Sequence, residues 1–186
     1  QYLIKNFSFD GVNKKSAVFD TAKLDWVSSQ NIMNKSTNEL LDLIKDYDSN
    51  WPRENISDEY LYKVIALIKE RFKTLAEVKK ESDYFFNDPK EYDEKSIQKC
   101  WNDSSSQIIR DFYLELEKIS SWNSISIEEM ITTFTQNQDI GLGKLMQPLR
   151  IALTGAMTGP SIPDLIEILK LETCKRRMQN ILNYIN

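Results

Sequence analysis

The stretch KLMQPLRIALTGAMTGPS at residues 144–161 places one arginine and two Gly-containing turns within an apolar pattern. A phosphate-binding loop requires Gly, four residues and then Gly-Lys-Ser/Thr after a strand, so that successive amides surround the phosphate. Here Gly155 and Gly159 are separated by three residues, no lysine follows them, and the preceding pattern is helical. The segment therefore does not predict a phosphate loop.

A helix followed by a turn explains the same residues better. Pro148 is expected near the first turn of the helix, where its missing N–H costs little, and Gly155 is expected to end the helix. A Gly-Pro turn at 159–160 follows, with Ser161 as the candidate cap of the next helix. Arg150 then lies on the helix flank beside this turn, where a guanidinium suits bases or phosphates, although a merely solvated arginine is the alternative. The side chains expected to face the core are Leu149, Ala152 and Leu153.

Catalytic chemistry is poorly supported because the chain contains no histidine. This excludes Ser-His and Cys-His nucleophile pairs and histidine-ligated metals. Acidic neighbours such as Asp111 with Glu115, among 28 carboxylates, are expected to line solvated helix faces. The two cysteines, Cys100 and Cys174, are too few for a disulfide framework or zinc site. We therefore predict no catalytic residue and no metal ligand in this chain.

The charge is unevenly distributed along the 186 residues. Residues 141–186 carry six basic and three acidic side chains, a local charge of +3. Because the net charge of the chain is −4, the remaining residues carry −7. This asymmetry permits a nucleic-acid-facing C-terminal region on an acidic body. The run Lys175-Arg176-Arg177, together with Lys144, supplies candidate phosphate contacts, with plain solubility as the equal alternative.

Apolar spacings of three and four residues predict an all-α protein. Capping-box patterns at Ser36-x-x-Glu39 and Ser126-x-x-Glu129 mark two helix starts. The helices are expected at 22–33, from 36 through 44, 57–78, 91–101, 104–120, 126–141, 143–154, 161–169 and 171–185, with a turn at 10–11. We expect a short remnant at 1–30, followed by two helical bundles at 31–120 and 121–186.

The aromatic residues could form a stacking platform for single-stranded bases, but they are scattered along the chain. We expect Trp26, Trp101 and Trp122 to be packed in the core. Trp51, which precedes Pro52 in a loop, is expected to be the most exposed of the four tryptophans.

Three stretches in sequence order resemble the C-terminal part of the bacterial-type glutamyl-tRNA synthetases. AVFDTAKLDWVSSQNI at 17–32 is similar to the family's AVFD-x-x-KL-x-W segment, and KERFKTLAEVKKESDYFF at 69–86 to its ER-x-KTL helix. GKLMQPLRIALTGAMTGPSIPDLIEIL at 143–169 resembles its PLR-x-ALTG-x-x-x-x-P element, so the resemblance covers essentially the whole chain.

The resemblance implies that this chain binds tRNA through a helical anticodon-binding cage, with residues 1–30 completing a stem-contact region. Arg150 is the position expected to contact an anticodon base. Arg71 or Lys73, in the other helical bundle, is the position expected to distinguish one anticodon base from another. The adjoining turn is expected to offer its main chain to the anticodon loop through Thr158, Gly159, Pro160, Ser161 and Ile162.

Three positions depart from the family's pattern. Gln147 stands where some relatives carry an aromatic residue, which puts base stacking there in doubt. Pro163 and Lys170 replace a usual aromatic residue and a glycine, so we expect a different turn after the helix at 161–169.

The implied whole enzyme uses ATP and Mg²⁺ to attach glutamate to its tRNA in the cytoplasm, but its nucleotide-binding motifs are missing here, so no cofactor is expected in this part. We expect a monomer without a membrane segment that binds glutamate tRNA, with glutamine tRNA left open as a second partner. The alternative is a helical protein-interaction module whose apolar stripes dock a partner without RNA. A metal-dependent hydrolase is disfavoured, because there is no histidine or clustered carboxylate motif.

Overall fold

The computed structural model describes residues 2–9, 18–52 and 56–185, and all of the regular structure in these ranges is helical. The predicted all-α class is therefore confirmed, while the turn expected at 10–11 lies outside the described residues. The helices are α1 (Tyr2–Asn6), α2 (Thr21–Met33), α3 (Thr37–Tyr47), α4 (Asp58–Ile68), the 3₁₀ turn η2 (Leu75–Glu77), α5 (Val78–Phe86), α6 (Glu94–Cys100), α7 (Ser105–Leu116), α8 (Ser124–Asn137), α9 (Leu142–Thr154) and α10 (Ile162–Ile185).

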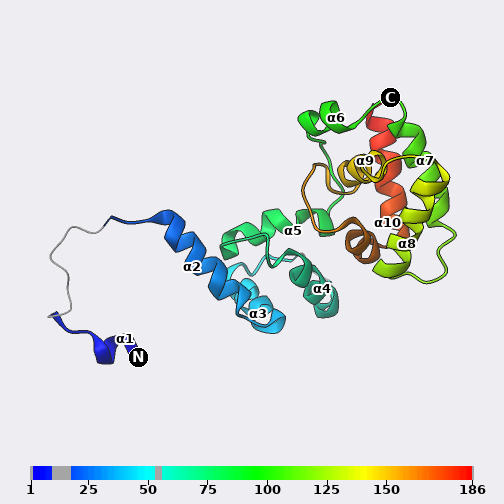
Figure 1. Ribbon diagram of the computed structural model, residues 1–186. Helices are drawn as coiled ribbons and strands as arrows, with labels where there is room; N and C mark the ends of the chain where they lie inside the picture. Colours follow the sequence, from blue (N-terminus) through cyan, green and yellow to red (C-terminus); the bar gives the residue numbers. More distant parts are fainter. Residues whose placement is uncertain (1, 10–17, 53–55, 186) are drawn as a thin grey trace.

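Two groups of helices make up the body of the molecule (Figure 1). Helices α3, α4 and α5 pack together, with α2 extending from them, while α6 to α10 form the larger group. The expected division at residue 120 is placed too late, because α6 and α7 pack against α9 in the larger group. The division instead falls in the segment between α5 and α6, and α4 also contacts α10 across it.

Local capping explains where several helices begin. The Ser36–Glu39 capping box is present, and the Ser57 hydroxyl accepts a hydrogen bond from the amide of Tyr60 at the start of α4. The second predicted capping box is wrong. Helix α8 begins at Ser124 because the side chain of Asn123 accepts from the amide of Ser126. An asparagine cap outside the box pattern thus starts this helix earlier.

The single helix predicted over 57–78 is interrupted after Ile68. Phe72 is buried in the intervening turn, and the amide of Lys73 donates to the Glu77 carboxylate, which satisfies a backbone group that the helix would have bonded. Apolar spacing continues through this segment, so periodicity alone did not reveal the break. Burial of Phe72 and local side-chain bonding replace the helical turn.

Two tryptophans differ from the prediction. Trp51 is 5% exposed, and its indole Nε1 donates to the Ser82 hydroxyl at 2.9 Å, so it is buried rather than exposed. Trp26, predicted to be packed, is 62% exposed on α2. Trp101 and Trp122 pack partly buried against the core, as predicted. A loop position next to proline therefore did not indicate exposure.

Helix α9 confirms most of the interpretation of 144–161. Leu149, Ala152 and Leu153 are fully buried, and Gly155 ends the helix with φ 83°. Pro148, however, lies in the middle of α9 rather than in its first turn, because the helix begins at Leu142. Its ring is buried there, and its lack of an N–H leaves the carbonyl one turn earlier without a helical donor.

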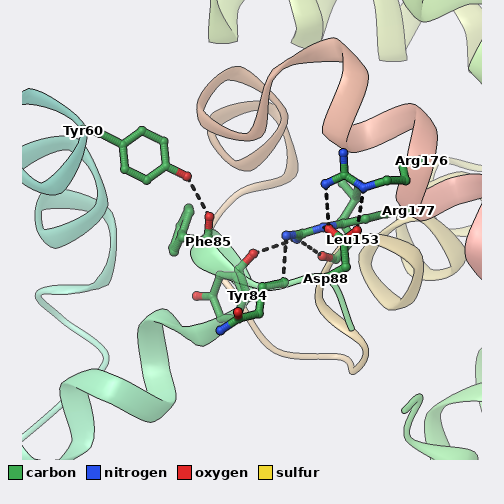
Figure 2. Close-up of polar contacts among 8 residues, drawn as sticks. Tyr60, Tyr84, Phe85, Asp88, Leu153, Arg176 and Arg177 are labelled. Carbon is green, nitrogen blue, oxygen red and sulfur yellow. Dashed lines mark hydrogen bonds and ion pairs between the residues drawn. The ribbon is translucent and has the colours of Figure 1, made fainter. Parts of the chain in front are cut away.

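Arg177 joins the two groups of helices (Figure 2). Its side chain is 1% exposed, and its guanidinium donates to three backbone carbonyls, those of Tyr84, Asn87 and Leu153, at 2.6–2.9 Å. The fourth hydrogen bond, from Nε, goes to Asp88 Oδ1 at 2.9 Å. One buried cation therefore fixes the end of α5 against the end of α9. Nearby, the Tyr60 hydroxyl donates to the carbonyl of Phe85 at 2.8 Å.

Asp88 is shared between two neighbouring arginines. Arg176 donates to both of its carboxylate oxygens, through Nε and Nη2, while Arg177 donates to one of them. The bonds from Arg176 are the main reason that the pKa of Asp88 falls to about 2, with those from Arg177 adding to the effect. The carboxylate therefore stays ionised and balances the buried charge of Arg177 throughout the neutral and mildly acidic range.

Lys170 divides α10 into two helices, as the separate predictions at 161–169 and 171–185 required. Its backbone has φ 66° and ψ 161°, a region that residues other than glycine rarely adopt. The chain thus places a lysine in a glycine-type conformation between two buried helical segments. Within the described residues, no helix combines the length and apolar character needed to cross a bilayer.

Replacing Arg177 with methionine is expected to lower the free energy of unfolding by about 3–5 kcal/mol, because three backbone carbonyls lose their donor and Asp88 loses one of its two arginine partners. The matched variant Arg176→Met removes an exposed arginine from the same carboxylate and should cost about 0–1 kcal/mol. Denaturant unfolding measures both. Similar losses in the two variants would contradict a central role for Arg177.

Lys170→Gly should stabilise the chain by about 1 kcal/mol, since relief of backbone strain exceeds the added flexibility of glycine in the unfolded state. Lys170→Ala is the control, because it removes the charged side chain but keeps Cβ and therefore the strain. Thermal unfolding of both variants checks this. An equal gain from alanine would show that the charge, not the backbone, is responsible.

Candidate nucleic-acid interface

Arg150 lies in the last turn of α9 and is half-buried against the turn that follows it. Its Nη1 donates to the carbonyl of Pro160 at 2.6 Å. In the part of the chain that the structure describes, no carboxylate forms an ion pair with this guanidinium. Burial lowers the pKa of Arg150, and the nearby Arg71 lowers it further. The arginine is thus held in place by a neutral group and keeps most of its donors for a ligand.

Thr154 organises the turn from 155 to 158. Its hydroxyl lies 2.9 Å from the carbonyl of Arg150, 2.7 Å from that of Ala156 and 3.1 Å from that of Thr158. Gly155 is needed at the end of α9, because a side chain there would approach the carbonyl of Glu91 at 3.0 Å in a left-handed backbone conformation. The helix end and the turn are therefore fixed before any ligand arrives.

Gly159 lies directly against the arginine. Its φ is 129°, and a Cβ built on it would lie 3.2 Å from Arg150 Nη1 and 3.3 Å from Thr154 Cγ2. Such a Cβ would also lie 3.9 Å from the ring carbon of Tyr84 that carries the hydroxyl. The missing side chain therefore lets the backbone, the guanidinium and the tyrosine ring meet at one point.

The other predicted turn residues differ in what they offer. Thr158 and Ser161 are exposed, but the Ser161 hydroxyl bonds to Asp164 as the cap of α10. Pro160 and Ile162 are buried, so their side chains face the core and only their backbone lies near the turn surface. Gln147 is exposed on α9, one helical turn before Arg150.

Arg71 and Lys73 lie in the turn between α4 and η2, and the structure separates them. Arg71 is close enough to Arg150 to affect its pKa, and its Nε lies 3.9 Å from Glu81 Oε2. Lys73 is exposed, and its carbonyl accepts a hydrogen bond from the Ser28 hydroxyl at 2.5 Å. Of the two candidates, Arg71 is therefore the one brought beside Arg150, from the opposite group of helices.

Tyr84 is a neighbour of these arginines that the sequence analysis did not single out. It is 8% exposed, and its hydroxyl is covered yet has no hydrogen-bond partner in the described structure. Burial raises its pKa to about 12; Arg71 and Arg150 oppose this rise, and Glu81 adds to it. The aromatic end of the 69–86 motif was visible in the sequence, but nothing there indicated an unsatisfied hydroxyl.

The four candidate phosphate contacts are not equivalent. The expected contact through Arg177 is wrong, because that side chain is buried and bonded to four protein oxygens. Lys175 pairs with Glu117 and lies 5.0 Å above the Tyr113 ring, and Arg176 pairs with Asp88. Lys144 is exposed and forms no ion pair with the described residues. Three of the four candidate cations, which lie within the second segment of α10, therefore make contacts inside the protein.

The arrangement suits recognition by hydrogen bonds and stacking. Two arginines, a turn with a glycine and an unsatisfied tyrosine hydroxyl meet where α5 approaches α9. Among the described residues, no three metal-ligating side chains come together. Guanidinium forks next to exposed backbone groups are suited to the edges of unstacked bases.

Comparison with known proteins assigns this arrangement to a family. The family model described as the anticodon binding domain matches residues 38–182, which is most of the chain. The chain belongs to the anticodon-binding domain family. The matched span of this anticodon-binding domain includes both Arg71 and Arg150.

Two curated relatives of this anticodon-binding domain are glutamate–tRNA ligases. It is 34% identical to a glutamate–tRNA ligase of Chlorobium chlorochromatii, over 100% of this chain and 39% of that protein. It is 30% identical to the corresponding ligase of Chloroherpeton thalassium, over 99% of this chain and 38% of that protein. The chain thus spans well under half the length of these curated relatives.

Solved structures show the same fold. A glutamate tRNA ligase from Elizabethkingia meningosepticum, in complex with its amino acid, matches with a TM-score of 0.86 and 27% identity, over 99% of this chain and 36% of that one. Glutamate-tRNA synthetase from Elizabethkingia anophelis matches with a TM-score of 0.81 over 97% of this chain and 35% of that one. The anticodon-binding domain described here thus resembles about a third of each solved chain.

Tyr84→Phe is expected to leave the free energy of unfolding unchanged or raise it by about 1 kcal/mol, because the hydroxyl is buried without a partner. Tyr60→Phe is the matched control. It removes a tyrosine hydroxyl that does donate, at 2.8 Å to Phe85, and should cost about 1 kcal/mol. Denaturant unfolding measures the pair. An equal loss in both variants would mean that Tyr84 has a partner in solution.

Proposed function

We propose that this chain is the anticodon-recognition part of a glutamate–tRNA ligase. Membership in the anticodon-binding domain family and similarity to glutamate–tRNA ligases over nearly the whole chain support this function. The main structural support for this function is the position of Arg150, which is held by the carbonyl of Pro160 beside an exposed turn. An arginine with spare donors at such a place can bind the acceptor edge of an unstacked base.

Recognition divides between side chain and backbone. Arg150 supplies paired N–H donors, and Arg71 supplies a second guanidinium from the other group of helices. The exposed turn at 158–161 offers backbone groups to the anticodon loop, with Gln147 beside it on α9. Lys144 is the basic residue best suited to a phosphate, while Lys175 and Arg176 would have to exchange their carboxylate partners for one.

The chemistry of the whole ligase lies outside this chain. The ligase attaches glutamate to its tRNA at the expense of ATP, with Mg²⁺ beside the nucleotide. Glutamate tRNA is the proposed partner, glutamine tRNA is a further candidate, and the protein works as a cytoplasmic monomer without a membrane partner. The contribution of this chain to the reaction is to select the tRNA and to orient it.

The alternative function, a protein-interaction module without RNA, has less support. It required the apolar helix stripes to dock a partner, but the stripe on α4, including Leu61, Val64 and Ile65, is almost fully buried in the core. The family assignment points to an anticodon as the ligand. RNA binding is therefore the preferred function.

Replacing Arg150 with alanine in the full-length ligase should raise the KM for tRNA by roughly 5- to 150-fold, the equivalent of about 1–3 kcal/mol for one bidentate base contact. At saturating tRNA, glutamate-dependent ATP–PPi exchange should fall much less. Discrimination between tRNAs that differ at an anticodon base should shrink. Aminoacylation kinetics with wild-type and anticodon-substituted transcripts measure these effects.

Arg110→Ala is the control, because Arg110 is an exposed arginine on α7 without an ion pair to the described residues. It should leave tRNA kinetics nearly unchanged. Filter binding of the wild-type ligase at two salt concentrations should show weaker binding at the higher one. If Arg150→Ala behaves like Arg110→Ala, the assignment of Arg150 fails.

A further inference from the structure

A cleft beside the arginines has a composition that the proposed function leaves unexplained. It has a volume of about 230 Å³ and lies between α5 and the turn after α9. Its walls combine carboxylates with hydroxyls and one lysine. The residues that line it include Lys80, Glu81, Asp83, Tyr84, Thr154 and Thr158. It thus adjoins the Arg150 turn through the two threonines.

Glu81 belongs to both the cleft and the arginine pair. Its carboxylate lines the cleft, and its Oε2 lies 3.9 Å from Arg71 Nε, a distance beyond that of a good hydrogen bond. The side chains of Glu81 and Arg71 are 26% and 33% exposed, so both are partly covered, and Arg71 stands beside a wall of the cleft through its contact with Glu81. The pair therefore presents a hydrogen-bond acceptor, the Glu81 carboxylate, next to a donor, the Arg71 guanidinium. At this distance both groups keep hydrogen-bonding capacity for a ligand.

One polar group in the wall of this cleft has no hydrogen-bond partner in the described structure. Tyr84 lines the same cleft with a hydroxyl that is covered and lacks a partner. Its ring also reaches Gly159, next to the guanidinium of Arg150. A buried hydroxyl without a hydrogen bond is unusual in a folded protein, and such groups concentrate where a ligand or a rearrangement supplies the partner.

The order of the groups favours one kind of base. A carboxylate accepts from an exocyclic amino group, and a guanidinium donates to a ring nitrogen or carbonyl. Cytosine presents an amino donor beside a ring-nitrogen acceptor and matches this order, as adenine does through N6 and N1. Uracil would place a carbonyl against the carboxylate and is repelled. A phosphate is disfavoured for the same reason, because Glu81 and Asp83 both carry negative charge.

We propose that Glu81 is a specificity-determining residue, which accepts the exocyclic amino group of one unstacked, cytosine-like base while Arg71 donates to the neighbouring acceptor of that base. This inference rests on the proposed function and adds a residue to it. Glu81 also holds Arg71 near its working position in the free protein. The carboxylate thereby selects against keto bases that the arginines alone would accept.

The test uses full-length ligase and glutamate tRNA transcripts in which each anticodon position is changed in turn between cytosine and uracil. Wild-type protein should prefer cytosine by roughly tenfold or more at one position, the equivalent of a single direct base contact. Glu81→Gln should reduce that preference to about threefold or less, because the amide both donates and accepts. The ratio of aminoacylation efficiency with cytosine to that with uracil should not change at the other anticodon positions.

Glu70→Gln is the matched control, since it removes the same charge from the exposed neighbour of Arg71 without touching the cleft. It should keep the wild-type ratios. An unchanged cytosine preference in Glu81→Gln overturns the inference, even if Arg150→Ala still weakens tRNA binding. If the wild-type ligase instead aminoacylates all of the anticodon-substituted transcripts equally well, the proposed function itself is overturned.

Discussion

The structure depends on how one buried guanidinium, that of Arg177, is held away from water. Arg177 is buried because the carbonyls of Tyr84 and Leu153, at the C-terminal ends of α5 and α9, converge on it together with that of Asn87 and the carboxylate of Asp88. Carbonyls at helix C-termini carry partial negative charge, so two helix ends share one cation. Since α5 carries Glu81 and Tyr84, and α9 carries Arg150, the same cation sets the distance between the two sides of the candidate interface.

A buried ion network of this kind is a poor way to gain stability, because removing two charges from water costs about as much as their attraction returns. Its value here lies in geometry. An apolar side chain of similar size could fill the space but would not hold three carbonyls in fixed directions. Asp88 extends the constraint outward to the exposed Arg176, and its low pKa keeps the network charged near neutral pH. The two groups of helices are thus locked in orientation rather than merely packed.

The sequence predicted features that depend on neighbours in the chain. The capping residue Ser36, the glycine that ends α9 and the position of Arg150 beside a turn all follow from local rules, and each is found in the structure. Burial of Arg177 and Trp51 was missed because it depends on partners 24–93 residues away in the sequence, which no local pattern records. The unpartnered hydroxyl of Tyr84 was hidden for the same reason.

The charge of the chain places a further demand on this interface. With 28 acidic against 24 basic residues, long-range attraction to RNA phosphates is weak, and much of the basic charge near the C-terminus is already paired. Affinity that rests on phosphates alone would also carry no sequence information. An arginine held by a neutral carbonyl avoids both difficulties, because its charge is not cancelled within the protein and its orientation is set before binding. Partial burial then strengthens each hydrogen bond that it makes, since the surrounding dielectric is lower than that of water. A few fixed donors on an acidic surface can therefore distinguish one loop from another where a broad basic patch would bind any RNA.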